Sequence, residues 1–272
     1  MIRRLSELIG KLNVVLFAPS ELNLIKGGPQ MRRRFLDIAI SQLRPAYYHL
    51  LDRYAKTLEQ RNSLLRKIKY EKFPADTLFV WDEKLAEYGA EIIKYRLKYA
   101  AEISEFARKI HSEICSDELT VSYKPRYTTK EELLERLSSD YLKEIEQGFT
   151  LYGPHRDDLS FIISGSEAKA YASQGQQRTA VLALKLAQAE LIFSETGEKP
   201  ILLLDDIMSE LDISRRAYLS EKITSGQAII TCTDTETVGA DGAKKYTYQT
   251  EKLFKNGGYL CICIWAVTLL LI

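Results

Sequence analysis

Two adjacent aspartates, Asp205 and Asp206, follow four apolar residues in the stretch ILLLDD at 201–206. A short apolar run of this kind predicts a buried strand, and open α/β sheets bind ligands at the carboxyl ends of their strands. A carboxylate in that place can hold Mg²⁺ together with phosphate oxygens and water. We therefore interpret Asp205 as a metal ligand and Asp206 as the group that deprotonates or positions a water attacking a phosphate. The alternative is a strand that ends in a solvated acidic turn.

A second candidate site lies in ASQGQQRTAVLALKLAQAELIF at 172–193, where polar residues open a largely apolar helix. Ser173 and Gln176 have the spacing of a capping box, so one interpretation is simply a well-capped helix. Gly175 lets a ligand approach the backbone, and the free N–H groups of a first helical turn attract phosphate. The other interpretation is an anion-binding site formed by these three residues.

Positive charge is concentrated between residues 26 and 72, although the whole chain carries a formal net charge of only +1. That segment has 12 lysines and arginines against four acids, a balance of +8. Such asymmetry is typical of an anion-binding face or of a solvated basic helix. Arg32, Arg33 and Arg34 fall within one helical turn, so they fan around the helix and do not all face one way.

Alternating strands and helices are predicted to position these groups. Apolar runs predict strands at 11–19, 158–164, 200–206 and 227–234. Between them we predict helices at 176–194 and at about 213–224, the second capped by Asp212. This alternation predicts a covered, largely parallel sheet.

The segment between residues 30 and 147 is predicted to be helical. A helix starts at Pro29, and two apolar stripes at 43–68 and 85–110, separated by Pro74, predict an antiparallel helical hairpin. A third helix follows, with Thr128 and Glu131 as its capping box. The chain is thus an α/β body at 1–29 and 148–258, a helical lobe at 30–147 and an apolar tail at 259–272.

The order of the motifs resembles the second half of an ABC-type ATPase head. SQGQQ at 173–177 resembles the signature motif, ILLLDD the Walker B strand and SELD at 209–212 the D-loop. The stretches at 16–37, 151–159 and 171–179 narrow the resemblance to the RecF family: LFAPSELNLIKGGPQMRRRFLD, LYGPHRDDL and YASQGQQRT. The fold class implied is α/β, a partial ABC-type P-loop ATPase head with an inserted α-helical second lobe.

The resemblance also implies a mechanism. ATP and Mg²⁺ are held between two heads of an ATP-dependent, head-to-tail homodimer. Asp205 would hold the metal and Asp206 would act on the attacking water. Ser173, Gly175 and Gln176 would reach the γ-phosphate bound by the partner, and Asp212 would lie at the dimer seam.

DNA is the macromolecular partner that the resemblance implies, at junctions of single strand and duplex. RecR and RecO would act with the protein in the cytoplasm to help load RecA at gaps, within the SOS response, and slow ATP hydrolysis would release the DNA. The basic segment supplies the expected backbone contacts, which carry affinity without reading sequence. These candidate contacts are Arg32, Arg33, Arg34, Arg66, Lys67 and Lys69.

Three features depart from the family pattern. No GxxxxGK[ST] occurs in the 272 residues, so the sequence resembles a RecF protein without roughly its first hundred residues, and ATP hydrolysis by this chain alone is uncertain. TCTD at 231–234 has Thr-Asp where such heads often carry a histidine, so Asp234 is not assigned that role. The tail YLCICIWAVTLLLI is too short to span a bilayer comfortably as a helix and is interpreted as a truncation or frame-shift scar, without function for Cys261 and Cys263. Its β-branched run could also form a strand, and a membrane-associating tail is the other alternative.

Alternatives stay open at this stage. The chain could be a non-hydrolysing DNA-binding or dimerisation fragment, a decayed reading frame, or another ABC-type head such as an OLD-family nuclease. The four cysteines have no zinc-site spacing and are typical of a reduced compartment, and no membrane association is expected of the main body. In GPHRDD at 153–158, His155 and Arg156 could contact phosphate or tether the signature loop. The other interpretation is a structural turn in which Arg156 pairs with Asp157 or Asp158.

Overall fold

The computed structural model describes residues 9–223, 226–232, 244–249 and 259–265. Its internal contacts divide the chain into two compact units. We call the first, Met1–Gly27, Glu102–Val121 and Phe161–Ile272, the sheet unit. The second, Gly28–Ala101 and Ser122–Ser160, is called the helical unit.

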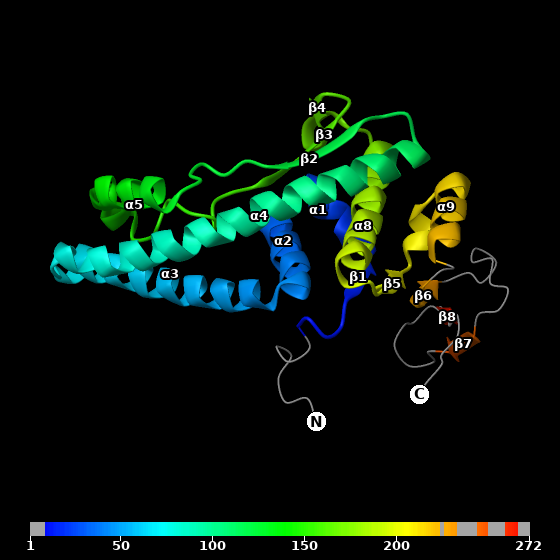
Figure 1. Cartoon of the computed structure of the whole chain (residues 1–272), viewed down its shortest axis with the longest axis horizontal. Helices are drawn as coiled ribbons and strands as arrows, with labels where there is room; N and C mark the ends of the chain where they lie inside the picture. Colours follow the sequence, from blue (N-terminus) through cyan, green and yellow to red (C-terminus); the bar gives the residue numbers. More distant parts are fainter. Residues whose placement is uncertain (1–8, 224–225, 233–243, 250–258, 266–272) are drawn as a thin grey trace. The chain divides into compact units, whose positions relative to one another are not determined.

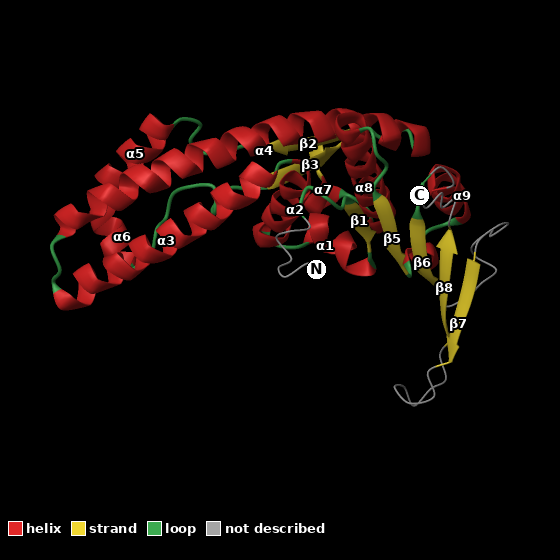
Figure 2. Ribbon diagram, turned by 60° about the horizontal axis from the view of Figure 1, so that its bottom comes forward, coloured by secondary structure: helices red, strands yellow, loops and turns green. Residues whose placement is uncertain are grey.

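A five-stranded sheet forms the centre of the sheet unit, with strand order β1-β5-β6-β8-β7 (Figure 2). The strands β1, β5 and β6 are parallel to one another, whereas β8 pairs antiparallel with both β6 and β7. The predicted parallel arrangement is therefore confirmed for the three strands that surround the acidic pair. The strand bounds are β1 Val14–Phe17, β5 Ile201–Asp205, β6 Ala228–Cys232, β7 Lys244–Gln249 and β8 Tyr259–Trp265.

Helix α8, Gln174–Thr196, packs on β1. It is buried along much of its length, because its middle carries an almost unbroken run of alanine, valine and leucine. Gly197 ends it in the left-handed conformation (φ 74°), which glycine adopts without steric cost. The remaining helices of this unit are short: η2 Pro19–Leu22, α1 Asn23–Lys26, α7 Ala168–Tyr171, η4 Ile207–Glu210 and α9 Ile213–Ile223.

The helical unit is built around a helical hairpin. Helices α3, Pro45–Glu71, and α4, Leu78–Ile114, run side by side (Figure 1), and Arg61 of α3 donates to Asp82 of α4 at 2.6 Å. Most of α4 lies in this unit, and its last residues belong to the sheet unit. The hairpin and its break near Pro74 are as predicted. The other helices are α2 Pro29–Leu43, η3 Ala75–Thr77, α5 Lys130–Ser139 and α6 Tyr141–Gln147.

Two details of the prediction were wrong. The capping box of α5 is formed by Thr129 and Glu132, because Thr129 Oγ1 accepts from the Glu132 backbone N–H at 3.1 Å. The strand predicted at 158–164 exists as β3, Leu159–Ile163, but it belongs to a separate three-stranded sheet. That sheet has the order β2-β3-β4, with β2 at Leu119–Tyr123 and β4 at Ser166–Glu167.

Part of the apolar tail forms a strand. Residues Tyr259–Trp265 make up β8, between β6 and β7 in the sheet, and residues 266–272 lie outside the described part of the chain. Among the described residues, no helix is both long enough and apolar enough to cross a membrane.

Candidate functional site

The first candidate site is the carboxyl end of β5. Asp205 is the last residue of that strand and is exposed, and it lies in register with Thr231 of the neighbouring parallel strand β6. The Thr231 hydroxyl donates to Asp205 Oδ1 at 2.7 Å. This contact fixes one carboxylate oxygen and leaves the other oxygen of an exposed group available for a ligand.

Asp206 is held in an unusual conformation directly after the strand. Its backbone is left-handed (φ 47°, ψ 23°), a conformation that is uncommon outside glycine and that aspartate adopts more readily than most residues with a Cβ. The backbone N–H donates to both the carbonyl oxygen and the hydroxyl of Thr231, each at 3.1 Å. Its side-chain Oδ1 is buried without a hydrogen-bond partner within the described part of the protein. A strained residue with an unpaired buried carboxylate oxygen is typical of a functional position.

The two carboxylates and the Thr231 hydroxyl are hard oxygen groups, so their chemistry fits Mg²⁺. The described residues contain no group of three or more histidine, cysteine, aspartate or glutamate side chains placed to hold a metal. Mg²⁺ usually takes only one or two carboxylates from a protein and fills its shell with water and phosphate oxygens. The exposed carboxylate of Asp205 is compatible with that mode of binding.

The second candidate site is the start of α8, where the predicted capping box is confirmed. Ser173 Oγ accepts from the Gln176 backbone N–H at 3.2 Å, and Gln176 Oε1 accepts from the Ser173 backbone N–H at 2.9 Å. Gln176 Nε2 also donates to Asp117 Oδ2 at 3.0 Å. Ser173 is exposed, so the cap is open to a ligand.

Gly175 has no packing reason to be glycine. A Cβ built on it would meet only Ser173 Oγ among the described atoms, at 3.9 Å, which is ordinary contact. Its backbone is helical, so it does not need the conformational freedom of glycine either. Since a helical glycine costs about 0.5–1 kcal/mol relative to alanine, the position favours close approach by a group from outside the chain.

Asp212 lies at the start of α9 and is connected to α8. Its Oδ1 accepts from the Arg215 backbone N–H at 2.9 Å, so Asp212 caps the helix as predicted. The Arg215 guanidinium pairs with the other Asp212 oxygen and donates to the Thr179 hydroxyl on α8 at 2.7 Å. Arg178 of α8 in turn pairs with Glu210 at 2.5 Å. The segment that follows the acidic pair is therefore attached to the helix that carries Ser173.

The six basic candidates divide into two kinds. Arg32 is buried and makes a two-pronged ion pair with Asp158 at 2.7 and 2.8 Å, and the half-buried Arg33 donates to the Asp157 carbonyl at 2.8 Å. Arg32 therefore stabilises the fold through this ion pair, and we do not propose it as a DNA contact. Those with exposed side chains are Arg34, Arg66, Lys67 and Lys69.

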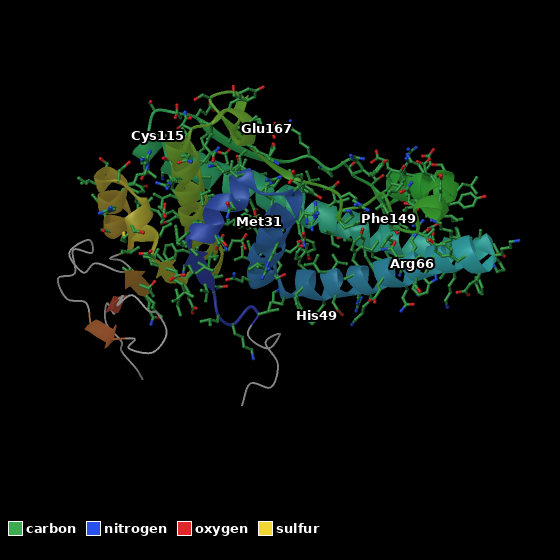
Figure 3. All side chains as sticks on the ribbon, turned by 180° about the vertical axis from the view of Figure 1, so that it is seen from behind. Met31, His49, Arg66, Cys115, Phe149 and Glu167 are labelled. Carbon is green, nitrogen blue, oxygen red and sulfur yellow. The ribbon has the colours of Figure 1, made fainter. Side chains whose placement is uncertain are left out.

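Among the exposed candidates, Arg66 lies on α3 beside the segment that carries Phe149 (Figure 3). Lys69 donates to the Glu146 carbonyl at 2.8 Å. Its ammonium group keeps two further N–H donors.

The GPHRDD segment has a structural role. His155 Nδ1 accepts from the Tyr54 hydroxyl at 2.6 Å, and His155 Nε2 lies 3.2 Å from the Thr150 carbonyl. Burial lowers the pKa of His155 to about 4, so the ring is neutral near pH 7 and does not attract phosphate.

Arg156 donates to the Thr150 carbonyl at 3.1 Å, while Asp158 pairs with Arg32 and Asp157 accepts from the Tyr123 hydroxyl at 2.6 Å. The structural interpretation of the motif was therefore right about its role. It was wrong about the partner, because the acids are held by Arg32 and Tyr123.

Sequence reasoning missed two positioning residues, Thr231 and Asp117. Thr231 was visible as the polar residue that follows an apolar strand, since parallel strands end at the same edge of a sheet. No sequence pattern could have indicated Asp117 as a partner of Gln176, because the two residues lie 59 positions apart. Asp234 lies outside the described residues.

The fold and these sites define the class of protein. A parallel sheet with two aspartates at the end of β5, a capped helix α8 and a helical lobe inserted in the chain make a partial ABC-type ATPase head. Comparison with known proteins then gives the family. The chain is 46% identical over 246 residues to the DNA replication and repair protein RecF of Alkaliphilus oremlandii, covering 86% of this chain and 67% of that protein. It is 40% identical over 268 residues to the RecF protein of Clostridium perfringens, covering 96% and 72%.

Solved structures agree with this result. The recombination mediator protein RecF of the RecFOR pathway, with ATPrS, matches with a TM-score of 0.83 at 40% identity over 88% of this chain and 67% of that one. The same type of protein with ATP matches with a TM-score of 0.77 at 42% identity over 82% and 62%. No protein-family model matches the chain. The chain belongs to the RecF family of DNA replication and repair proteins, and it spans about two thirds of the length of these relatives.

Proposed function

We propose that the chain is a nucleotide-gated DNA-binding protein of recombinational repair. The observation that carries the proposal is the end of β5, where Asp205 is exposed and Asp206 keeps a buried carboxylate oxygen without a partner in the described part of the protein. When bound, Mg²⁺ and ATP would supply the phosphates and their charge. Asp205 would hold the metal, and Asp206 would orient a water or take its proton.

Two copies of the head would face each other across one nucleotide. Ser173, Gly175 and Gln176 at the start of α8 would contact the γ-phosphate held by a second copy, and Asp212 would lie at the seam of this ATP-dependent homodimer. The open cap and the glycine that packing does not require support this assignment. The printed sequence contains no GxxxxGK[ST], so this model needs a phosphate-binding loop from outside these 272 residues.

DNA would bind through the exposed basic side chains of the helical unit. Arg34, Arg66 and Lys67 are exposed, and Lys69 is exposed with spare donors, so all four can contact backbone phosphates. The half-buried Arg33 is a secondary candidate. A gap in duplex DNA is the proposed substrate. In the cytoplasm, RecO and RecR would be the protein partners, and the assembly would help load RecA during the SOS response.

A second candidate function is DNA binding or dimerisation without nucleotide control. The absence of a GxxxxGK[ST] motif from the sequence favours it. The two candidates differ in one measurable property, because only the first makes DNA affinity depend on nucleotide.

The test is a titration of fluorescently labelled gapped duplex, read by anisotropy at several salt concentrations, with the chain joined to a segment that supplies the GxxxxGK[ST] loop and, in parallel, with the 272-residue chain alone. Gated binding predicts that ATP with Mg²⁺ tightens the complex, and that log Kd rises linearly with log salt. Salt-dependent binding that ignores ATP would establish the second candidate. An absence of DNA binding at 50 mM salt would reject the first candidate and leave only dimerisation from the second.

A further inference from the structure

The turn between α3 and α4 forms an exposed end of the helical unit. Arg61 and Asp82 are the buried ion pair that joins the two helices, so the 20 residues between them make up the end of the hairpin. We call residues 66–84 the hairpin tip. Helix α3 ends at Glu71, a single turn of 3₁₀ helix follows at Ala75–Thr77, and α4 starts at Leu78. Only Leu78 of this turn is deeply buried, at 3% exposure.

Large apolar side chains are exposed throughout the hairpin tip. Tyr70 is 73% exposed, Phe73 45%, Phe79 61% and Val80 55%. Single exposed apolar residues are ordinary on protein surfaces. Four within eleven consecutive positions, three of them aromatic, mark a surface that binds something.

The charges around these rings are mostly positive. Arg66, Lys67, Lys69 and Lys72 are exposed on the α3 side and Lys84 on the α4 side, whereas the acids with exposed side chains between 66 and 84 are Glu71, Asp76 and Glu83, the last of which pairs with Lys130. Asp82 is buried against Arg61 and does not offset this charge at the surface. Lysines also lie over rings, because Lys69 Nζ is 5.1 Å from the Tyr70 centroid and Lys84 Nζ is 5.8 Å from the Trp81 centroid.

We propose that the hairpin tip binds single-stranded nucleic acid. The rings of Tyr70, Phe73 and Phe79 stack on unpaired bases, and the neighbouring lysines and Arg66 bind the phosphates between those bases. Exposed aromatic rings interleaved with cations are the means by which proteins bind single strands without reading sequence. In a duplex the bases stack on one another, so their faces are closed to these rings.

This inference rests on the proposed DNA binding. It adds that the hairpin tip binds the single-stranded part of a gapped DNA. The basic side chains contact phosphates in both forms of DNA, whereas the rings contact bases in the single strand alone. An apolar protein partner is the competing occupant. The excess of lysine and arginine in the hairpin tip favours a polyanion over that occupant.

The test compares fluorescein-labelled oligothymidylate with a duplex of the same length, each titrated with the whole chain at fixed salt. Replacing Tyr70 and Phe73 together by alanine is expected to raise Kd for the single strand by at least about fivefold, given the usual contribution of a stacked base. Kd for the duplex stays within twofold. Tyr171→Ala, which removes a tyrosine that is 78% exposed in the sheet unit, serves as the matched control and leaves both values unchanged.

A second pair of variants separates stacking from general apolar contact. Tyr70→Phe keeps the ring and is expected to bind the single strand like the wild type, whereas Tyr70→Leu keeps apolar bulk and is expected to bind it more weakly. Circular dichroism checks that each variant is folded. These residues are exposed, so no loss of fold is expected.

Three results obtained with the double variant would overturn the proposal. The first is equal weakening of single strand and duplex by the double variant, and the second is no weakening of either. The third is self-association of the wild type in sedimentation velocity that the double variant abolishes, because the tip would then be a protein contact. A wild type that binds the duplex alone rejects this inference and keeps the proposed DNA binding, whereas binding to neither form rejects both.

Discussion

Asp206 and Gly175 each have a feature that packing within the described part of the chain does not explain. Asp206 combines a left-handed backbone with a buried carboxylate oxygen that has no protein partner in the described region. Gly175 sits in a helix where an alanine would fit. Residues that lower stability without a packing reason are commonly retained for function.

Replacing Gly175 by alanine separates stability from function. We expect the free energy of unfolding in urea to rise by up to about 0.5–1 kcal/mol, because alanine loses less backbone entropy in a helix. The added methyl group would lie where a phosphate approaches, so ATP-dependent dimerisation of the chain joined to a phosphate-binding loop is expected to weaken in sedimentation velocity. A variant that dimerises like the wild type would place the ligand elsewhere.

His155 makes stability depend on pH in a defined direction. Burial is the main cause that lowers its pKa to about 4, and Arg156, Arg33 and Arg61 lower it further, while the Thr150 carbonyl opposes them. The unfolded histidine has its ordinary pKa of about 6.5, so the unfolded state binds more protons between these values. The contribution is therefore fully present above about pH 6.5 and is lost as the pH falls towards 4.

The measurement is urea unfolding of wild type and His155→Gln between pH 4 and 7. Over this range the wild type is expected to lose more stability than the variant by up to roughly 3 kcal/mol. Comparing the two slopes cancels the other titrating groups, including Asp157, whose pKa is raised by burial. Parallel slopes would mean that the imidazole is solvated in the folded protein.

At the scale of elements, the helical hairpin depends on one buried arginine. Arg61 is fully buried on α3, where it contacts Asp82 of α4 at 2.6 Å, Glu144 of α6 at 2.6 Å and the Thr150 hydroxyl at 2.9 Å. Burial raises the pKa of both carboxyl groups, and Arg61 acts against that rise. The guanidinium of Arg61 therefore connects α3 to both α4 and α6.

Arg61→Met is expected to destabilise the protein by about 3–5 kcal/mol at pH 7, because it leaves two buried carboxylates without a cation. Their folded pKa then lies above the unfolded value, so they destabilise least at low pH and increasingly as the pH rises through the folded pKa. The loss should therefore be smaller at pH 5. Lys56→Met, which breaks an exposed pair with Asp52 on the same helix, is the control and should change stability by no more than about 1 kcal/mol.

The apolar periodicity of the sequence predicts where most helices and strands lie. It does not predict which strands pair or which distant side chains contact one another. The strands that became β1, β5 and β6, the hairpin and the caps at Ser173 and Asp212 follow from local apolar spacing and side-chain chemistry. The sheet to which β3 belongs could not be predicted in this way, because residues that are distant in the sequence decide which strands pair. Arg32 shows the same limit. The sequence does not distinguish the three consecutive arginines. In the structure Arg32 is the one that pairs with Asp158, which lies 126 positions away.

At the scale of the molecule, the two units carry different parts of the proposed function. The sheet unit contains the acidic strand end and the capped start of α8, and the helical unit contains the exposed basic and aromatic residues. Helix α4 contributes residues to both, and the loop after it supplies Asp117, which holds Gln176. If nucleotide and DNA bind to these units as proposed, linkage requires that each ligand change the affinity for the other by the same factor.

The most direct measurement is the ratio of Kd values for gapped duplex DNA without and with ATP and Mg²⁺, compared between wild type and Asp205→Asn, each joined to a segment that supplies the phosphate-binding loop. A coupling of ordinary size predicts a ratio of roughly ten for the wild type. Because asparagine cannot supply the anionic oxygen that Mg²⁺ requires, the ratio should fall to about one in the variant. A wild-type ratio of one, or a variant that responds to ATP as strongly as the wild type, would contradict the assignment of the β5 end as the nucleotide-metal site.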